Sequence, residues 1–330
     1  MSGITRWALP LVLVLVFAAC GTADDSSSTP EPKKTDNVDL TQGGDMTIAV
    51  ITHGDGGSFW AVAKKGAEDA GKDLGITVKY SESNNDAQQQ AQMIEAAVTE
   101  KVDGLAVSAP DPDAISSAVK KATDAGIPVI TLNSGLSDYQ KLGAITHVGQ
   151  TESIAGEAAG RRFKDDGAKK LLCIIHEQSN IGLNERCDGA KKGFGGETVN
   201  LQVKGTADVQ TTLTEIQSKL QADKSFDAVM ALNPDIAEAA KTAIKDSSSS
   251  AKLATFDQSG PVIKDIQAGT IEFAVDQQQY LQGYLPIVFL KLFVTNANTV
   301  GGGQAVLTGP GFVDKDNAAT IEQLAQDGTR

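Results

Sequence analysis

The sequence predicts an α/β fold made of two similar Rossmann-like lobes, each containing a parallel sheet. From residue 46 onward, short runs rich in β-branched residues alternate with longer segments of helical periodicity, an alternation typical of βαβ units. The stretch "FDAVMALNPD" at 226–235 repeats "VDGLAVSAPD" at 102–111, with an offset of 124 residues. Further segments repeat in the same order at nearly the same offset, which indicates two copies of one unit.

The first copy supplies four expected strands and two expected helices. The strands are bounded by Gly or Asp and fall at 46–52, 75–80, 104–108 and 127–132. The helices carry apolar or small residues at helical spacing and fall between the first three strands, at 59–74 and 86–100. Because consecutive parallel strands need a crossover helix, this half of the chain should form an open sheet covered by helices.

The second copy is expected to follow the same order. "LLCIIHE" at 171–177 corresponds to "TIAVITH" at 47–53. The segment that begins at Asp86 corresponds to one that begins at Asp208, at an offset of 122, and a loop insertion accounts for the two-residue difference. Shared order and spacing over several segments make a chance match a poor explanation.

Residues 1–44 stand outside this pattern. Arg6 precedes an apolar run at 7–19, which is too short to span a membrane comfortably and is typical of a signal peptide. Small residues end the run directly before Cys20. This resembles the lipobox of bacterial lipoproteins and implies a lipid on Cys20, with an ordinary signal peptide and a chance cysteine as the alternative. Residues 20–44 are polar, so a disordered tether is expected.

Composition and charge exclude several classes of function. The formal net charge of −13 argues against nucleic-acid binding, which needs a basic face. Five arginines provide few groups for gripping a phosphate or a carboxylate. The chain contains no G-x-S-x-G motif and no Walker loop, so the sequence favours a binding protein over an enzyme. Cys173 and Cys187 form either a disulfide, which an oxidising compartment permits, or two buried thiols.

Polar residues follow the expected strands in both copies, where open α/β sheets bind their ligands. The second copy places Asp257 opposite Asn133 and Asn233 opposite Ala109. Two such edges that face each other would form a cleft with polar groups on both walls. The candidates are His53, Phe59, Trp60, Asn133 and Ser134 in the first copy, and Glu177, Asn180, Asn184, Arg186, Asp208, Asn233 and Asp257 in the second.

These segments resemble the periplasmic sugar-binding proteins of ABC importers, in the ribose-binding-like branch of the type I fold. The motifs that carry the resemblance are "FWAVAKKGAEDAGKDLGITV", "PVITLNSG", "NERCDGAKKGF", "ALNPD", "ATFDQSG" and "VDQQQYLQGY". The resemblance implies a hinge of three crossovers, near 133–150, 257–277 and 298–306. It implies an N-terminal lobe of 45–147 plus about 277–304, and a C-terminal lobe of 148–276 plus about 305–330.

The resemblance also implies which residues contact the ligand. Phe59 and Trp60 occupy the family's aromatic pair after the first strand. Asn233, Asp257 and Gln277 match the family's Asn, Asp and Gln. Amides and carboxylates suit sugar hydroxyls, which both donate and accept hydrogen bonds, and aromatic rings suit the apolar faces of sugars.

Three positions depart from the family pattern. Asn133 stands where members often have Asp, whereas Ser134 and Asn184 stand where many have Arg. The departures at Ser134 and Asn184 remove positively charged, forked donors. They favour a small neutral ligand, a pentose or a polyol of four to six carbons, over the family's common pyranose.

Several candidates have structural alternatives. His53 serves as a ligand donor or as a structural residue, and Asp208 as a ligand contact or only as a helix cap. Arg186 fits an ion pair that anchors a helix better than a ligand contact. His53, His147 and His176 do not form a recognisable zinc motif, so neither a metal nor a cofactor is expected.

The expected function is that of an extracytoplasmic substrate-binding lipoprotein. It would capture a neutral sugar or sugar alcohol between its lobes and deliver it to an ABC permease with its ATPase subunits. The protein should act as a monomer held at the cell membrane by its N-terminal lipid. A sugar-sensing receptor module of the same fold is the alternative, and a carbohydrate-active enzyme fits the sequence less well.

Overall fold

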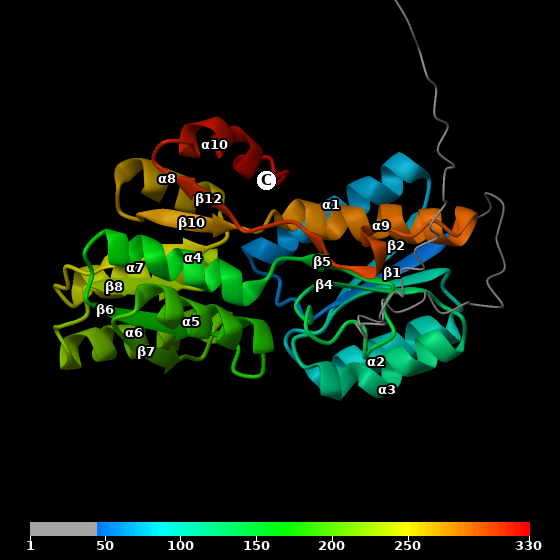
Figure 1. The fold of residues 1–330 in the computed structure, drawn as a ribbon, viewed down its shortest axis with the longest axis horizontal. Coiled ribbons are helices and arrows are strands. Elements are labelled where there is room, and N and C mark those ends of the chain that lie inside the picture. Colours follow the sequence, from blue (N-terminus) through cyan, green and yellow to red (C-terminus); the bar gives the residue numbers. More distant parts are fainter. Residues whose placement is uncertain (1–44) are drawn as a thin grey trace, which may run out of the picture. The chain divides into compact units, whose positions relative to one another are not determined.

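The computed structural model describes residues 45–330. The expected signal peptide, the lipidation site Cys20 and the tether lie outside the described residues. Each of the two lobes contains one six-stranded sheet with helices on both faces (Figure 1). The predicted α/β fold with two similar lobes is confirmed.

The first sheet is parallel throughout. Its strand order is β11 (Val306–Leu307), β5 (Thr146–Gly149), β4 (Val129–Asn133), β3 (Gly104–Ser108), β1 (Thr47–Thr52) and β2 (Thr77–Glu82). Helices α1 (Ser58–Leu74) and α9 (Gln279–Asn296) pack together against one face. Helices α2 (Ala87–Thr99) and α3 (Pro112–Asp124) cover the other.

The second sheet repeats this order. Its strands are β12 (Gly311–Asp314), β10 (Phe273–Asp276), β9 (Lys252–Phe256), β8 (Ala228–Ala231), β6 (Lys170–Ile175) and β7 (Glu197–Gln202). Only the pairing of β12 with β10 is antiparallel among the strands that the structure describes. Strands β3, β1 and β2 occupy the same places in the first sheet as β8, β6 and β7 occupy in the second. This equivalence accounts for the repeat in the sequence.

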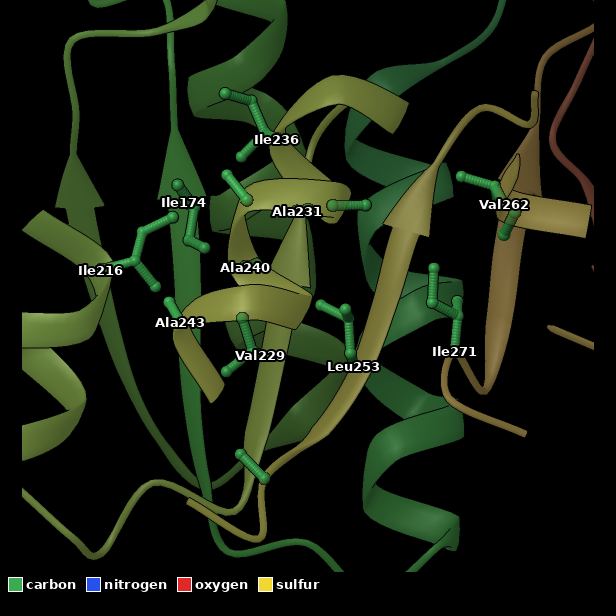
Figure 2. Packing of buried hydrophobic residues seen from close by; sticks show 14 of the residues in the cluster. Ile174, Ile216, Val229, Ala231, Ile236, Ala240, Ala243, Leu253, Val262 and Ile271 are labelled. Carbon is green, nitrogen blue, oxygen red and sulfur yellow. The ribbon is translucent and has the colours of Figure 1, made fainter. Parts of the chain in front are cut away.

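Two helix layers cover the second sheet. Helices α4 (Glu152–Asp165) and α5 (Ile181–Phe194) form one layer. The other contains the 3-10 turn η1 (Thr206–Asp208), α6 (Val209–Ala222), α7 (Pro234–Asp246), α8 (Gly260–Ala268) and α10 (Ala318–Gln326). Figure 2 shows this second layer closing on the sheet, with Ile236 and Ala240 of α7 above Val229 and Leu253. These apolar side chains are buried, as the hydrophobic effect requires for a sheet covered on both faces.

The chain passes between the sheets three times. The first sheet ends with β5 and the second lobe begins with α4, so the first crossing lies at 150–151. The second lies at 277–278, between β10 and α9. The third lies at 308–310, after β11, and not in the expected range 298–306. Strand β11 still pairs with β5, and its two residues are too few for a sequence pattern to detect.

The glycine-rich segment within the expected range 298–306 belongs to the first lobe. It forms the short 3-10 turn η2 (Gly301–Gly303) before β11. Tyr139 Oη donates a hydrogen bond to Gly303 O at 2.8 Å, and Thr146 Oγ1 donates to Gln304 O at 2.9 Å. These bonds hold the turn against the first sheet, so it does not form the hinge.

Cys173 of β6 and Cys187 of α5 form a disulfide, with their Cα atoms 5.9 Å apart. Both residues are fully buried. The bond ties β6, an inner strand of the second sheet, to the helix that covers it, and it resolves the alternative of two buried thiols.

Helices α4 and α5 approach each other closely because small residues face the contact. An added Cβ at Gly160 would lie 2.2 Å from the backbone oxygen of Ala190. No side chain larger than hydrogen fits there without moving the helices apart. Within residues 45–330, the structure contains no helix of the length and apolar character needed to cross a membrane.

Candidate functional site

A pocket that is partly open to solvent lies between the carboxyl ends of the two sheets. Both lobes contribute to its lining, as expected for a ligand site in an α/β protein. Seven of the predicted ligand residues line it: His53, Phe59, Trp60, Asn133, Asn233, Asp257 and Gln277. The fold brings these residues together because each follows a strand or begins a helix at the sheet edge that faces the pocket.

The wall from the first lobe is aromatic near the start of α1. Phe59 and Trp60 pack edge to face, with ring centroids 4.9 Å apart, and both are buried. The His53 ring packs against Trp60 at 4.8 Å, again edge to face. Ser108 Oγ lies 2.7 Å from His53 Nδ1 and fixes the orientation of the imidazole. An apolar face of a ligand can pack on this wall while its polar groups face the second lobe.

Asp257 provides the main carboxylate of the second wall. Its Oδ2 accepts a hydrogen bond from Gln277 Nε2 at 3.2 Å, and its Oδ1 has no partner among the described residues. Burial raises the pKa of this carboxyl to about 7, although the nearby Arg186 guanidinium opposes the shift. A buried polar oxygen without a partner is costly, so this atom is well suited to accept a hydrogen bond from a ligand hydroxyl.

Asn233 and His176 form a polar pair beside Asp257. Asn233 Nδ2 lies 3.0 Å from His176 Nε2, and Asn233 Oδ1 caps α7 by accepting from Ile236 N at 2.7 Å. Burial lowers the pKa of His176. The side chain of Asn233 therefore has a structural task as well as a place in the pocket lining.

Three predicted ligand residues lie outside the pocket lining. Ser134 is buried behind it, with Oγ 3.0 Å from Asn133 Oδ1 and 3.3 Å from Asn180 Oδ1. Asn184 lies one turn into α5 and donates to Asn180 O at 3.0 Å. Asp208 is the exposed N-cap of α6 and accepts from Thr211 N at 3.0 Å. In this structure Asp208 therefore serves as a helix cap, the alternative to a ligand contact.

Arg186 lines the pocket but is already paired. Its Nε and Nη2 donate to the Glu152 carboxylate at 2.6 and 2.9 Å, and Nη1 donates to Leu232 O at 3.1 Å. The guanidinium also lies 4.5 Å from the centre of the Phe256 ring. The expected ion pair that anchors a helix is present, and its buried carboxylate partner neutralises the charge that Arg186 would otherwise offer to an anion.

Glu177 lines the pocket and contacts the opposite lobe. Its Oε2 accepts from Asn180 Nδ2 at 2.6 Å and lies 3.5 Å from His53 Nε2 of the opposite lobe. Burial raises the pKa of this carboxyl, but the contacts with His53, His176 and Asn180 outweigh it and hold the pKa below its ordinary value. Glu177 and Asn180 follow β6, and that position is the only sequence signal that pointed to them.

Sequence reasoning missed Asp55 and Asp235, which contact the opposite lobe at the edge of the pocket. Asp235 Oδ2 lies 3.2 Å from both Ser58 N and Ser58 Oγ. Thr206 Oγ1 donates a hydrogen bond to Asp55 Oδ2. Neither contact leaves a sequence signal, because each joins residues more than 150 positions apart.

The three histidines do not come together. His53 and His176 both line the pocket, with Glu177 between them, whereas His147 is buried outside it and pairs with Thr131 Oγ1 at 2.9 Å. Among residues 45–330, no group of three or more potential ligands is arranged to hold a metal ion.

Comparison with known proteins assigns the family. The profile of the family described as "Periplasmic binding protein domain" matches residues 48–297. The chain belongs to this family. Its members are solute-binding proteins rather than enzymes, and the family implies a location outside the cytoplasm.

Relatives of this periplasmic binding protein include two proteins named as sugar-binding proteins. The xylose/arabinose-binding protein of Sulfolobus acidocaldarius is 24% identical over 82% of this chain and 71% of the relative. The ribose import binding protein of Bacillus subtilis is 26% identical over 69% of this chain and 74% of the relative.

Solved structures of periplasmic binding proteins share the fold. A carbohydrate transporter from Acidothermus cellulolyticus 11B, in complex with myo-inositol, is 43% identical. Its TM-score is 0.85, and the match covers 87% of this chain and all of that chain. A solute-binding protein of an ABC transporter from Burkholderia graminis, in complex with D-arabinose, has a TM-score of 0.76 at 23% identity, over 84% of this chain and 98% of that chain.

Proposed function

We propose that this protein is the substrate-binding component of an ABC importer for a small neutral polyol, with cyclitols such as myo-inositol as the leading ligand class. The observation that carries the proposal is the pairing of an aromatic wall with a wall of amides and one unpartnered carboxylate oxygen, on Asp257. The 43% identical carbohydrate transporter in complex with myo-inositol supports the same ligand class.

The chemistry of the pocket favours hydroxyl groups over charged groups. Asp257 Oδ1 would accept from one ligand hydroxyl, and Gln277, Asn133 and Asn233 provide amide donors and acceptors for others. Phe59 and Trp60 would pack against the CH face of the ring. An acidic ligand would meet Asp257 and Glu177, while Arg186 is committed to Glu152.

Lobe closure would couple binding to transport. The ligand contacts both walls, so it stabilises the closed arrangement, and the permease with its ATPase subunits would recognise that arrangement. We further propose that the protein acts as a monomer and that a lipid on Cys20 anchors it to the cell membrane. Replacement of Cys20 by Ala should release the protein from the membrane fraction, and retention of the variant would contradict the anchor.

A ligand screen tests the proposed function. Thermal unfolding of the full chain would be measured with pentoses, hexoses, cyclitols, linear polyols and sugar acids. A ligand at 100 times its dissociation constant should raise the free energy of unfolding by about 2.7 kcal/mol. A response confined to neutral polyols supports the proposal. A response confined to sugar acids, or none in the whole set, would overturn it.

A further inference from the structure

Helix α1, which carries the aromatic wall, lacks a capping side chain of its own. Its N-cap residue is Gly57, and its first turn contains no acidic residue. The first backbone N–H groups of a helix have no partner within the helix, so they need an acceptor from elsewhere. Phe59 and Trp60 follow directly, so the start of this helix also sets the position of the pocket wall.

The acceptor comes from the opposite lobe. Asp235, in the first turn of α7, brings its carboxylate to 3.2 Å from both Ser58 N and Ser58 Oγ. An added Cβ at Gly57 would lie 2.9 Å from Asp235 Oδ2, so the missing side chain permits this approach. A carboxylate at a helix N-terminus is also favourable for the helix dipole.

The internal repeat explains why Asp235 is free for this contact. Its equivalent in the first lobe is Asp111, which caps its own helix α3 by accepting from Ala114 N at 3.1 Å. In the second lobe, Asn233 caps α7 instead, by accepting from Ile236 N at 2.7 Å. The substitution of Asn233 for Ala109 in the second copy thus moves the cap and releases the later carboxylate.

A second contact crosses the cleft beside the first. Asp55 Oδ1 accepts from Gly57 N at 3.0 Å, and Asp55 Oδ2 accepts from Thr206 Oγ1 of the second lobe. The turn before α1 is therefore held across the cleft on one side by Thr206 and on the other by Asp235. Neither bond can persist when the lobes separate.

We propose that Asp235 is a positioning residue that caps α1 from the opposite lobe and so couples lobe closure to the placement of the Phe59–Trp60 wall. Opening removes the cap and loosens the start of α1, and closure restores both. The proposal rests on the binding function proposed above for its ligand readout, but its structural readout needs no ligand.

Trp60 provides that structural readout. The chain contains two tryptophans, so Trp7→Phe leaves Trp60 as the only one. Acrylamide quenching and the emission maximum of Trp60 would be measured in the full chain without polyol and again with saturating myo-inositol, because the cap belongs to the closed arrangement. Asp235→Ala should increase quenching and shift emission to longer wavelength, because the buried indole becomes more accessible. Asp235→Asn, which keeps an acceptor oxygen, should recover most of the protection.

Calorimetric titration with myo-inositol provides the second readout. Because the cap forms only in the closed state, its loss in Asp235→Ala lowers the stability of that state. The dissociation constant for myo-inositol should then rise about fivefold, which corresponds to the typical contribution of one helix cap. Asp111→Ala is the matched control, because it removes a cap at the equivalent position within a single lobe and lies outside the pocket lining. It should change neither Trp60 quenching nor the dissociation constant.

The two readouts separate this inference from the proposed function. If the parent protein binds no polyol, the proposed function fails, and quenching alone decides the role of Asp235. If the quenching of Trp60 in Asp235→Ala equals that in the parent protein, or does not exceed that in Asp111→Ala, both without and with myo-inositol, the inference is overturned. Increased quenching that Asp235→Asn reverses supports it.

Discussion

Asp257 and Asn133 occupy equivalent positions in the two lobes and share the left-handed backbone conformation, with φ of 63° and 61°. Asn and Asp tolerate this region better than most residues. Each follows a strand, β9 or β4, and each points into the pocket. Asn133 Nδ2 donates to Gln282 Oε1 at 3.3 Å, whereas Asp257 retains an oxygen without a partner. The two equivalent positions thus share one backbone geometry but carry different side chains, an amide on one wall of the pocket and a carboxylate on the other.

The buried carboxyl of Asp257 should make stability depend on pH. Burial, opposed by Arg186, raises its pKa from 3.8 to about 7. Between these values the folded state holds a proton that the unfolded state has released. The free energy of unfolding contributed by this group therefore falls as the pH rises from about 4 to about 7, by up to about 4 kcal/mol, and is constant above that.

Denaturant unfolding of the parent protein and Asp257→Asn at several pH values measures this contribution. The neutral amide cannot titrate, so the stability of the parent protein minus that of the variant should decline over this pH window. Parallel pH profiles for the two proteins would show that Asp257 does not titrate as described.

The Glu152–Arg186 pair should be essential for stability. Both side chains are nearly fully buried, and their closest contact is 2.6 Å. Glu152→Gln leaves the guanidinium without its charged partner and should lower the free energy of unfolding by about 3–5 kcal/mol. Glu157→Gln on the same helix removes the charge that pairs with Arg161 and Lys192, both of which are exposed, and should cost less than about 1 kcal/mol. Equal losses in urea denaturation would contradict this account of the buried pair.

The contact between α4 and α5 should not tolerate an added methyl group. The Cβ of Gly160→Ala would lie 2.2 Å from Ala190 O, so the helices must separate at a cost of about 1–3 kcal/mol. That loss should exceed the gain in helix propensity of about 1 kcal/mol. The added methyl of Gly260→Ala, at the start of α8, would meet Gln326 Cγ at an ordinary contact distance of 3.7 Å, so this variant should be nearly neutral. Thermal unfolding compares the two, and an unchanged melting temperature for Gly160→Ala would refute the prediction.

The repeat explains why much of the fold was predictable. Strand runs such as 104–108 and helical periodicity such as 59–74 are local signals, and their recurrence at one offset indicates a second copy. Strand β11 gave no such signal, because two residues carry no periodicity and their pairing depends on distant β5. The third crossing was therefore expected too early in the chain.

A place in the pocket lining was predictable for residues that directly follow a strand, such as His53 and Asp257. Asp208 follows the same rule in sequence but caps its own helix, and a sequence cannot distinguish these two uses of an aspartate. Asp235 was missed for the opposite reason. It resembles an ordinary residue of a helical first turn, and its partner Ser58 lies in the other lobe.

Isothermal titration calorimetry of myo-inositol into the full chain tests the central claim most directly, with Asp257→Ala as the paired variant. We predict saturable binding at one site per chain in the parent protein and its loss in Asp257→Ala. Binding that persists unchanged in Asp257→Ala would place the ligand elsewhere. Absence of binding by the parent protein, together with binding of an acidic sugar, would contradict a neutral polyol pocket built around Asp257.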